Sequence, residues 1–298
     1  MRKKTTLSLF LVYLLVSTLL MGGCSKSKSS GNGGFNVLVI GQVGHGKSEL
    51  SASIASAYGE KTKSAEECKS EGVVYHAASI SIKSDSREYN IYDFPEHGDI
   101  CKSIASKGIA PDGAILVVSA LDGPMVQSKE QLKLLKGLGI KNLVVYVSNW
   151  NDSELVIEDI KSLVGEMGFD VNKVEFITDN GDFSKDNAKK AVSVMDKWTA
   201  ENNKAGSVSG ASVEVYSYLL TKEEGGKHVP LLTGDELEIT INNKTYKGKV
   251  NASDIDMLMP GDSCVEVFEL DEEVSAKPGD KVIAKKDGQT ILVGVVFG

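Results

Sequence analysis

The residues with the clearest capacity for chemistry lie in one run of eight, G-Q-V-G-H-G-K-S, from Gly41 to Ser48. The spacing G-x-x-x-x-G-K-[ST] is that of a phosphate-binding loop (P-loop) between a strand and a helix. Its glycines let backbone N–H groups face phosphate oxygens, and the helix N-terminus adds a favourable dipole. In such a loop the lysine reaches the β and γ phosphates, and the serine hydroxyl is a ligand of Mg²⁺. We therefore expect nucleotide contacts from Gly41, Gly44, His45, Gly46, Lys47 and Ser48.

A nucleotide site of this type also needs an acid on a neighbouring strand that helps to hold Mg²⁺. Asp93 follows the β-rich run Tyr89 to Tyr92 and fits this role, so we predict Ser48 and Asp93 as the metal ligands. His97, four residues further on, stands where a group that orients a hydrolytic water would lie. It is the candidate catalytic residue, and a surface histidine without that role is the alternative.

The elements that must position these residues alternate between strand and helix from residue 35 to 200. This alternation predicts an α/β P-loop domain with a mostly parallel sheet and right-handed crossovers. We expect strands over residues 37–40, 78–82, 89–92, 114–119 and 143–148, and helices over residues 47–58, 99–107, 128–138, 153–167 and 185–199.

The pattern changes after residue 200. Residues 201–211 are polar and rich in Gly, Ser and Asn, which predicts a linker. Residues 212–298 alternate in the manner of strands, carry turn signals such as Pro260-Gly261-Asp262, and show no helical period. We therefore expect a second domain that is a small antiparallel β-barrel.

The first 24 residues predict a secretory leader. A basic start is followed by an apolar stretch, Leu7 to Met21, that is too short for a comfortable membrane span. Two glycines then precede Cys24, which resembles the processing site of bacterial lipoproteins, where the cysteine becomes lipidated. We expect a lipid anchor at Cys24, a flexible tether over residues 25–34, and a location on the outer face of the cytoplasmic membrane or on the bacterial cell surface. An uncleaved signal anchor is the alternative.

Composition argues against three classes of protein, although a local basic patch stays possible. A net charge of −8 and a pI of about 5.2 argue against non-specific nucleic-acid binding through a basic surface. The cysteines number four, and their spacing fits neither a disulfide framework nor a zinc site.

Three stretches closely resemble the elongation factor Tu family of translational GTPases: residues 41–48, residues 93–97, and D-G-A-I-L-V-V-S-A-L-D-G-P-M-V-Q from Asp112 to Gln127. The resemblance implies GTP or GDP and Mg²⁺ as bound cofactors. The C-terminal part resembles the third domain of the same family, in Glu214-Val215-Tyr216, in residues 222–230 and in residues 257–262. The family's middle β-barrel, which helps to hold the aminoacylated end of tRNA, has no counterpart.

The departures from the family concern its switch. Glu96 replaces a glycine that contacts the γ-phosphate; its carboxylate is repelled by a triphosphate, and its Cβ restricts the backbone. Val74 stands in place of a threonine that coordinates Mg²⁺ and the γ-phosphate, and it offers no oxygen. His97 aligns with the family's hydrolytic histidine. We therefore expect weak or absent hydrolysis.

The family recognises guanine through N-K-x-D, whose carboxylate accepts two hydrogen bonds from the base. Aligned without a gap, these four positions are Ser148, Asn149, Trp150 and Asn151, and the carboxylate is lost. Shifted by one residue, they run from Asn149 to Asp152, and only the lysine is replaced. We favour the shifted alignment, with Asn149 and Asp152 as base contacts.

Two functions of different classes follow. The first is a membrane-tethered GTP-binding protein of the elongation factor Tu type, with a degenerate switch and no expected role in delivering aminoacyl-tRNA. The second is a non-enzymatic surface lipoprotein that uses this scaffold as a protein-binding module. In both cases we expect a protein partner on the β-barrel domain.

Overall fold

The computed structural model describes residues 34–62, 64–70, 73–95, 97–152, 154–199, 206–251 and 257–297. The predicted leader with Cys24 and residues 201–205 of the predicted linker lie outside these residues. Within the described ranges, no helix has the length and apolar character that a membrane crossing requires.

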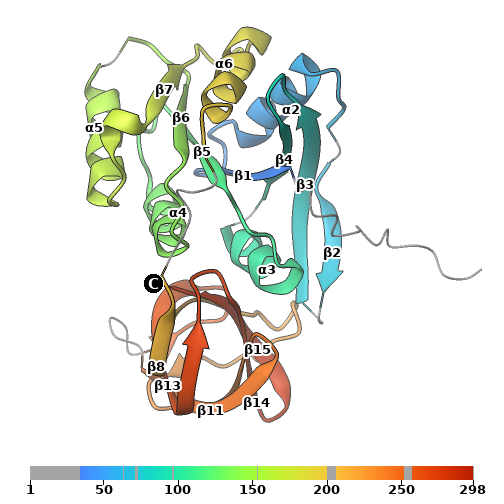
Figure 1. Cartoon of the computed structure of the whole chain (residues 1–298), viewed down its shortest axis with the longest axis vertical. Coiled ribbons are helices and arrows are strands. Elements are labelled where there is room, and N and C mark those ends of the chain that lie inside the picture. The colour runs from blue at the N-terminus through green and yellow to red at the C-terminus, as the bar shows by residue number, and fades with distance from the viewer. Residues whose placement is uncertain are drawn as a thin grey trace, which may run out of the picture. The chain divides into compact units, whose positions relative to one another are not determined.

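The first domain is built on a seven-stranded sheet with the order β2-β3-β4-β1-β5-β6-β7 (Figure 1). The pairs from β4 to β7 are parallel, whereas β2 and β3 form an antiparallel edge. The strands are β1 (Phe35–Ile40), β2 (Glu66–Ser70), β3 (Val73–Lys83), β4 (Glu88–Asp93), β5 (Gly113–Ser119), β6 (Leu143–Ser148) and β7 (Glu175–Thr178).

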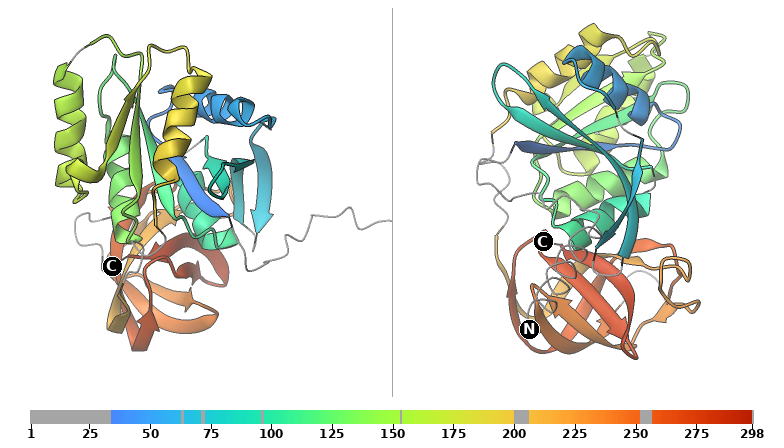
Figure 2. Two further views of the ribbon diagram at one scale, coloured as in Figure 1. Left: turned by 45° about the horizontal axis from the view of Figure 1, so that its top comes forward. Right: turned by 90° about the vertical axis from the view of Figure 1, so that its right-hand side faces the viewer.

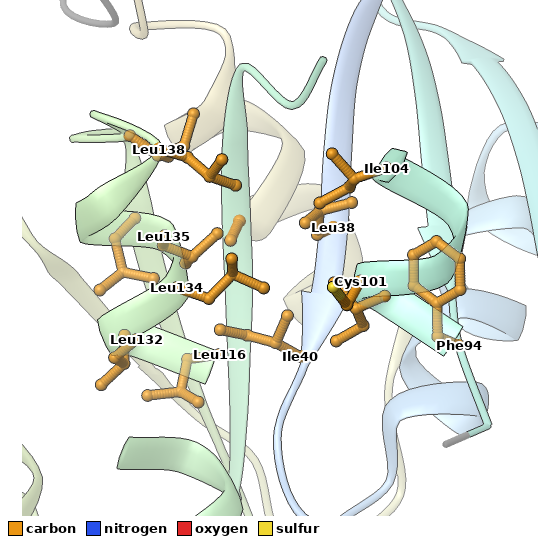
Figure 3. Packing of buried hydrophobic residues seen from close by; sticks show 14 of the residues in the cluster. Leu38, Ile40, Phe94, Cys101, Ile104, Leu116, Leu132, Leu134, Leu135 and Leu138 are labelled. Atoms are coloured by element: carbon orange, nitrogen blue, oxygen red, sulfur yellow. The ribbon is translucent and has the colours of Figure 1, made fainter. Parts of the chain in front are cut away.

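Helices cover both faces of this sheet. α2 (Lys47–Ala57) and α6 (Lys185–Met195) share a core with one face. α3 (His97–Lys107), α4 (Val126–Gly137) and α5 (Glu154–Glu166) cover the other, where apolar side chains of α3 and α4 meet those of β1 and β5 (Figure 3). A short 3₁₀ turn, η1 (Val171–Lys173), precedes β7. Each central strand is buried on both faces, which explains its continuous apolar sequence.

The predicted α/β domain with a mostly parallel sheet is confirmed, but some elements differ. The strand expected over residues 78–82 begins earlier, at Val73, and pairs with β2, which we did not predict. β7 was also missed. β2 (E-E-C-K-S) and β7 (E-F-I-T) are the two edge strands of the sheet. Each is short, and burial at an edge does not impose a clear apolar pattern.

The second domain is the predicted antiparallel β-barrel (Figure 2). Its strands close in the order β10-β11-β13-β8-β15-β14. Its first strand begins at Val208, inside the stretch predicted as linker, because the Ser/Gly-rich start of this strand lacks an apolar pattern. The barrel strands are β8 (Val208–Leu219), β10 (Glu236–Ile241), β11 (Lys244–Asn251), β13 (Ser263–Ala276), β14 (Lys281–Lys286) and β15 (Gln289–Val296), and a separate small sheet pairs β9 (Leu231–Leu232) with β12 (Met257–Leu258).

A buried ion network joins α3 to the barrel. The Lys102 ammonium lies 2.9 Å from the Asp99 carboxylate and 2.6 Å from that of Glu224, and Asp99 is fully buried. Asp99 also accepts a hydrogen bond from the backbone N–H of His76 in β3, at 3.0 Å. Burial alone would lower the pKa of Lys102, but hydrogen bonds to Glu224 and Asp99 outweigh it and raise the pKa. The lysine therefore stays charged and links β3, α3 and the barrel.

The barrel interior holds an acid. Val213, Val215 and Leu219 of β8 belong to the barrel core, and Ser217 shares their side of the strand. The Ser217 hydroxyl donates to the carboxylate of Glu266, which is fully buried, at 3.1 Å. Burial raises the pKa of Glu266 from 4.5 to about 7. Between pH 4.5 and about 7, Glu266 is therefore protonated in the native state and ionised in the unfolded chain.

Because the native pKa of Glu266 lies above its unfolded value, its contribution to stability is complete below pH 4.5 and is lost as pH rises toward 7. A shift of this size corresponds to roughly 3 kcal/mol. We expect Glu266→Gln to remove this part of the pH dependence in urea unfolding followed between pH 4.5 and 8. Glu273→Gln, at an exposed position of the same strand, is the control. Equal pH profiles for wild type and Glu266→Gln would contradict the assignment.

Candidate nucleotide-binding site

The P-loop connects the carboxyl end of β1 to the first turn of α2. Gly41 has a φ of 134°, and a Cβ at this position would lie 2.2 Å from the carbonyl oxygen of Val117 in β5. Gly46 caps α2 with a φ of 99°, and a Cβ there would meet the ring of Phe183 at 2.1 Å. Both positions therefore require glycine, because another residue would be strained at these positive φ angles and its Cβ would clash.

Lys47 folds back over the loop. Its ammonium donates to the carbonyl oxygens of Gly41 and Gln42 at 3.0 and 3.1 Å. The side chain is only 9% exposed, and burial lowers the pKa of Lys47, partly offset by the Asp93 carboxylate. A phosphate bound at the loop would be a nearby opposite charge, which would stabilise the charged form of Lys47. The charged lysine would in turn attract the phosphate.

Ser48 and Asp93 meet across the loop. The Ser48 hydroxyl donates to Oδ2 of Asp93 at 2.7 Å, and Oδ1 of Asp93 is buried without a hydrogen-bond partner. Burial raises the pKa of Asp93, although the Ser48 hydrogen bond and the Lys47 charge oppose this effect. A hydroxyl and a carboxylate with an unused oxygen suit Mg²⁺, which prefers oxygen ligands.

These two residues form only part of a metal site. The described ranges contain no group of three or more His, Cys, Asp or Glu side chains that could hold a metal ion. Ser48 and Asp93 would therefore bind Mg²⁺ together with phosphate oxygens of a nucleotide, as magnesium commonly does.

His45 contributes its backbone to the loop and turns its side chain inward. The imidazole is 3% exposed, and its Nε2 lies 3.5 Å from the exposed carboxylate of Asp122. Burial lowers the pKa of His45, although the charge of Asp122 opposes the shift. The His45 carbonyl accepts a hydrogen bond from the Ser148 hydroxyl at 2.8 Å, which ties the P-loop to the end of β6.

The expected base-recognition corner follows β6. Asn149 and Asp152 both have positive φ angles, 53° and 62°. The Asn149 amide lies 3.4 Å from the Ser119 hydroxyl at the end of β5. The indole N–H of Trp150 donates to Oδ1 of the exposed Asp152 at 3.0 Å. Asn149 and Asp152 thus share one short loop beside the P-loop, and the geometry leaves both alignments of this motif open.

The loop after β7 packs against this corner through Asp179 and Gly181, and no residue of this loop was predicted to belong to the site. The Asp179 carboxylate accepts hydrogen bonds from the backbone N–H groups of Gly181 and Phe183 at 2.8 and 3.0 Å. Although burial raises its pKa, these bonds and one from Asn187 lower the pKa of Asp179 to about 2. Asp179 is therefore occupied in shaping the loop, a role that the turn sequence D-N-G could have indicated.

Two further residues of the site, Gln131 and Phe183, were not predicted, because nothing in their local sequence indicates a contact with the P-loop. The Gln131 side chain on α4 accepts a hydrogen bond from the N–H of Gly41 at 2.6 Å and so anchors the start of the P-loop. The Phe183 ring covers Gly46 and stacks on Tyr146, with 6.0 Å between ring centroids. Both are contacts between segments distant in sequence.

The switch residues are described only in part. His97 is the first residue of α3, but its side chain and the whole of Glu96 lie outside the described structure. Val74 lies in β3, where its backbone pairs with Lys69 of β2, and its side chain is likewise not described. The predicted catalytic role of His97 therefore remains a prediction.

A glycine loop at the head of a helix, a buried lysine, and a serine hydroxyl bonded to a strand-end aspartate together define a P-loop nucleotide-binding domain. Comparison with known families narrows this class. Residues 34–178 match the model described as the elongation factor Tu GTP binding domain, so this part of the chain is similar to that domain.

A curated relative is also an elongation factor Tu. The apicoplast elongation factor Tu of Theileria parva is 33% identical over 185 residues, which is 56% of this chain and 45% of that protein. The chain therefore spans less than half the length of this relative, and the similarity concerns part of the protein rather than its whole architecture.

Proposed function

We propose that the chain binds a guanine nucleotide, GDP or GTP, together with Mg²⁺ at the P-loop. The observation that carries the proposal is the contact between Ser48 and Asp93 beside the buried side chain of Lys47, in the first turn of α2 and at the end of β4. These are the oxygen ligands and the positive charge that a magnesium–phosphate group requires.

We propose further that Asp152 gives selectivity for guanine. Guanine presents two adjacent donors, N1–H and the 2-amino group, and a carboxylate can accept from both. Asp152→Asn replaces one acceptor by a donor, which matches the 2-oxo group of xanthine instead. We expect GDP binding to weaken by about 10- to 100-fold, since hydrogen bonds to charged groups contribute about 1.5–3 kcal/mol, and xanthosine diphosphate binding to strengthen.

The measurement is a calorimetric titration of the wild-type chain and of Asp152→Asn with GDP, xanthosine diphosphate and ADP. Asp159→Asn, at an exposed position of α5, is the matched control and should bind like wild type. Unchanged base preference in Asp152→Asn would contradict the shifted alignment and favour the register in which Asn151 faces the base.

We propose weak or absent hydrolysis. Val74 has no oxygen for Mg²⁺, and Glu96 places a negative charge where the family has glycine. His97, at the start of α3, is the residue that we propose to orient a hydrolytic water if any turnover occurs. Delivery of aminoacyl-tRNA is not part of the proposal, because the middle barrel has no counterpart in the sequence.

We propose that Cys24 is lipidated and holds the chain at the outer face of the membrane, as the leader sequence supports. We also propose a protein partner on the barrel. Apolar side chains that are 45–52% exposed gather on and beside the small sheet of β9 and β12, and such clusters typically mark interaction sites. They are Val229, Leu232, Met257 and Met259. If no nucleotide binds, this surface supports the alternative of a non-enzymatic binding module.

A further inference from the structure

Trp150 occupies the position that the shifted alignment assigns to the lysine of N-K-x-D. A tryptophan has no positive charge, so Trp150 cannot act at this position in the way that the family's lysine does. Its side chain makes one polar contact and one apolar contact, and its backbone makes a third contact to the opposite loop.

The polar contact is the hydrogen bond from the indole Nε1–H to Oδ1 of Asp152, at 3.0 Å. A carboxylate oxygen has two lone pairs, so this bond leaves Oδ2 and one lone pair of Oδ1 free to accept from another donor pair. Because Asp152 is otherwise exposed, the indole is the described group that fixes the direction of its carboxylate.

The other two contacts hold Trp150 itself in place. Its ring packs against the buried core on the α4 and α5 side of the sheet, and its backbone N–H donates to the carbonyl of Asp179 at 2.8 Å. Asn149, the preceding residue, faces Gly181 so closely that a Cβ there would lie 2.6 Å from the Asn149 side-chain oxygen. The loop after β6 is therefore held against the loop after β7. Because Trp150 is fixed by these contacts, its indole N–H holds the Asp152 carboxylate in one direction.

We infer that Trp150 is a positioning residue for base recognition: its indole N–H orients the Asp152 carboxylate toward the N1–H and 2-amino donors of guanine. This inference rests on the proposed function. An acceptor that is already oriented loses less conformational entropy when the base binds, which increases affinity for the base that uses both oxygens.

The test is Trp150→Phe, which keeps an aromatic ring and removes the indole N–H. The full chain in detergent is titrated with GDP, with inosine diphosphate, which lacks the 2-amino group, and with ADP. We expect GDP affinity to fall about tenfold, the equivalent of about 1.4 kcal/mol. Inosine diphosphate affinity should fall less, so the preference for GDP over inosine diphosphate shrinks. Trp198→Phe, the same substitution at the chain's other tryptophan, should change neither value.

Each remaining outcome overturns the inference. An equal loss for GDP and inosine diphosphate would show that Trp150 only stabilises the loop. Unchanged GDP affinity would show that the indole bond has no role in binding, and a gain would show that the indole competes with the base. Failure of the wild-type chain to bind GDP would instead overturn the proposed function, and the inference with it, which separates the two cases.

Discussion

Lys47→Ala is expected to weaken binding of Mg²⁺-GDP by at least about 100-fold. The lysine is the buried cation nearest to the loop amides, and its ammonium already has the carbonyls of Gly41 and Gln42 as partners on the protein side. Hydrogen bonds between charged groups contribute about 1.5–3 kcal/mol each, and loss of the charge also removes an attraction to every phosphate within reach.

Calorimetric titration checks this prediction, with circular dichroism as the test that the variant stays folded. Lys61→Ala removes an exposed lysine shortly after α2 and is the matched control, which should bind as wild type does. If Lys47→Ala retains wild-type affinity, phosphate is not held by this loop, and the proposed site is wrong.

Lys102→Met should lower the free energy of unfolding by about 3–5 kcal/mol. Removing one partner of a buried ionic network leaves an uncompensated charge in a medium of low polarity, which costs more than the intact pair contributes. Here the fully buried Asp99 carboxylate would keep the N–H of His76 as its described partner and lose the ammonium at 2.9 Å. Glu224 would lose its cationic partner at the same time and keep its hydrogen bonds from the Tyr218 hydroxyl and the Thr221 N–H.

Urea unfolding followed by circular dichroism measures the change. Lys133→Met, at an exposed position of α4, is the same substitution without a buried partner and should change stability by less than about 0.5 kcal/mol. A loss below 1 kcal/mol for Lys102→Met would mean that the network contributes little, and that apolar packing alone holds α3 against the barrel.

The sequence was informative where local chemistry decides the structure. The P-loop spacing, the continuous apolar runs of β1, β5 and β6, and the turn signals of the barrel all predicted the elements that form, because backbone geometry and burial on both faces impose those patterns. Asp93 could be predicted as the partner of Ser48 because it ends a strand adjacent to β1, and the two side chains meet at 2.7 Å.

What could not be predicted depends on contacts between distant segments. β2 pairs with β3 at the edge of the sheet, where no buried face dictates an alternating pattern. Gln131 reaches Gly41 across 90 positions of sequence, and Phe183 covers Gly46 from the loop after β7. Lys102 and Glu224 are 122 residues apart, and nothing in their local sequence indicates that they meet. Such pairs are set by the tertiary packing of whole elements.

The most direct test of guanine-nucleotide binding is a calorimetric titration of the full chain in detergent with Mg²⁺-GDP and, in parallel, with Mg²⁺-ADP. We expect a dissociation constant for GDP in the micromolar range or tighter, about −8 kcal/mol or better, and binding of ADP weaker by at least about 100-fold. Equal affinity for GDP and ADP would contradict guanine recognition at the Asp152 corner. No binding of either nucleotide would contradict the central claim and leave the scaffold as a protein-binding module.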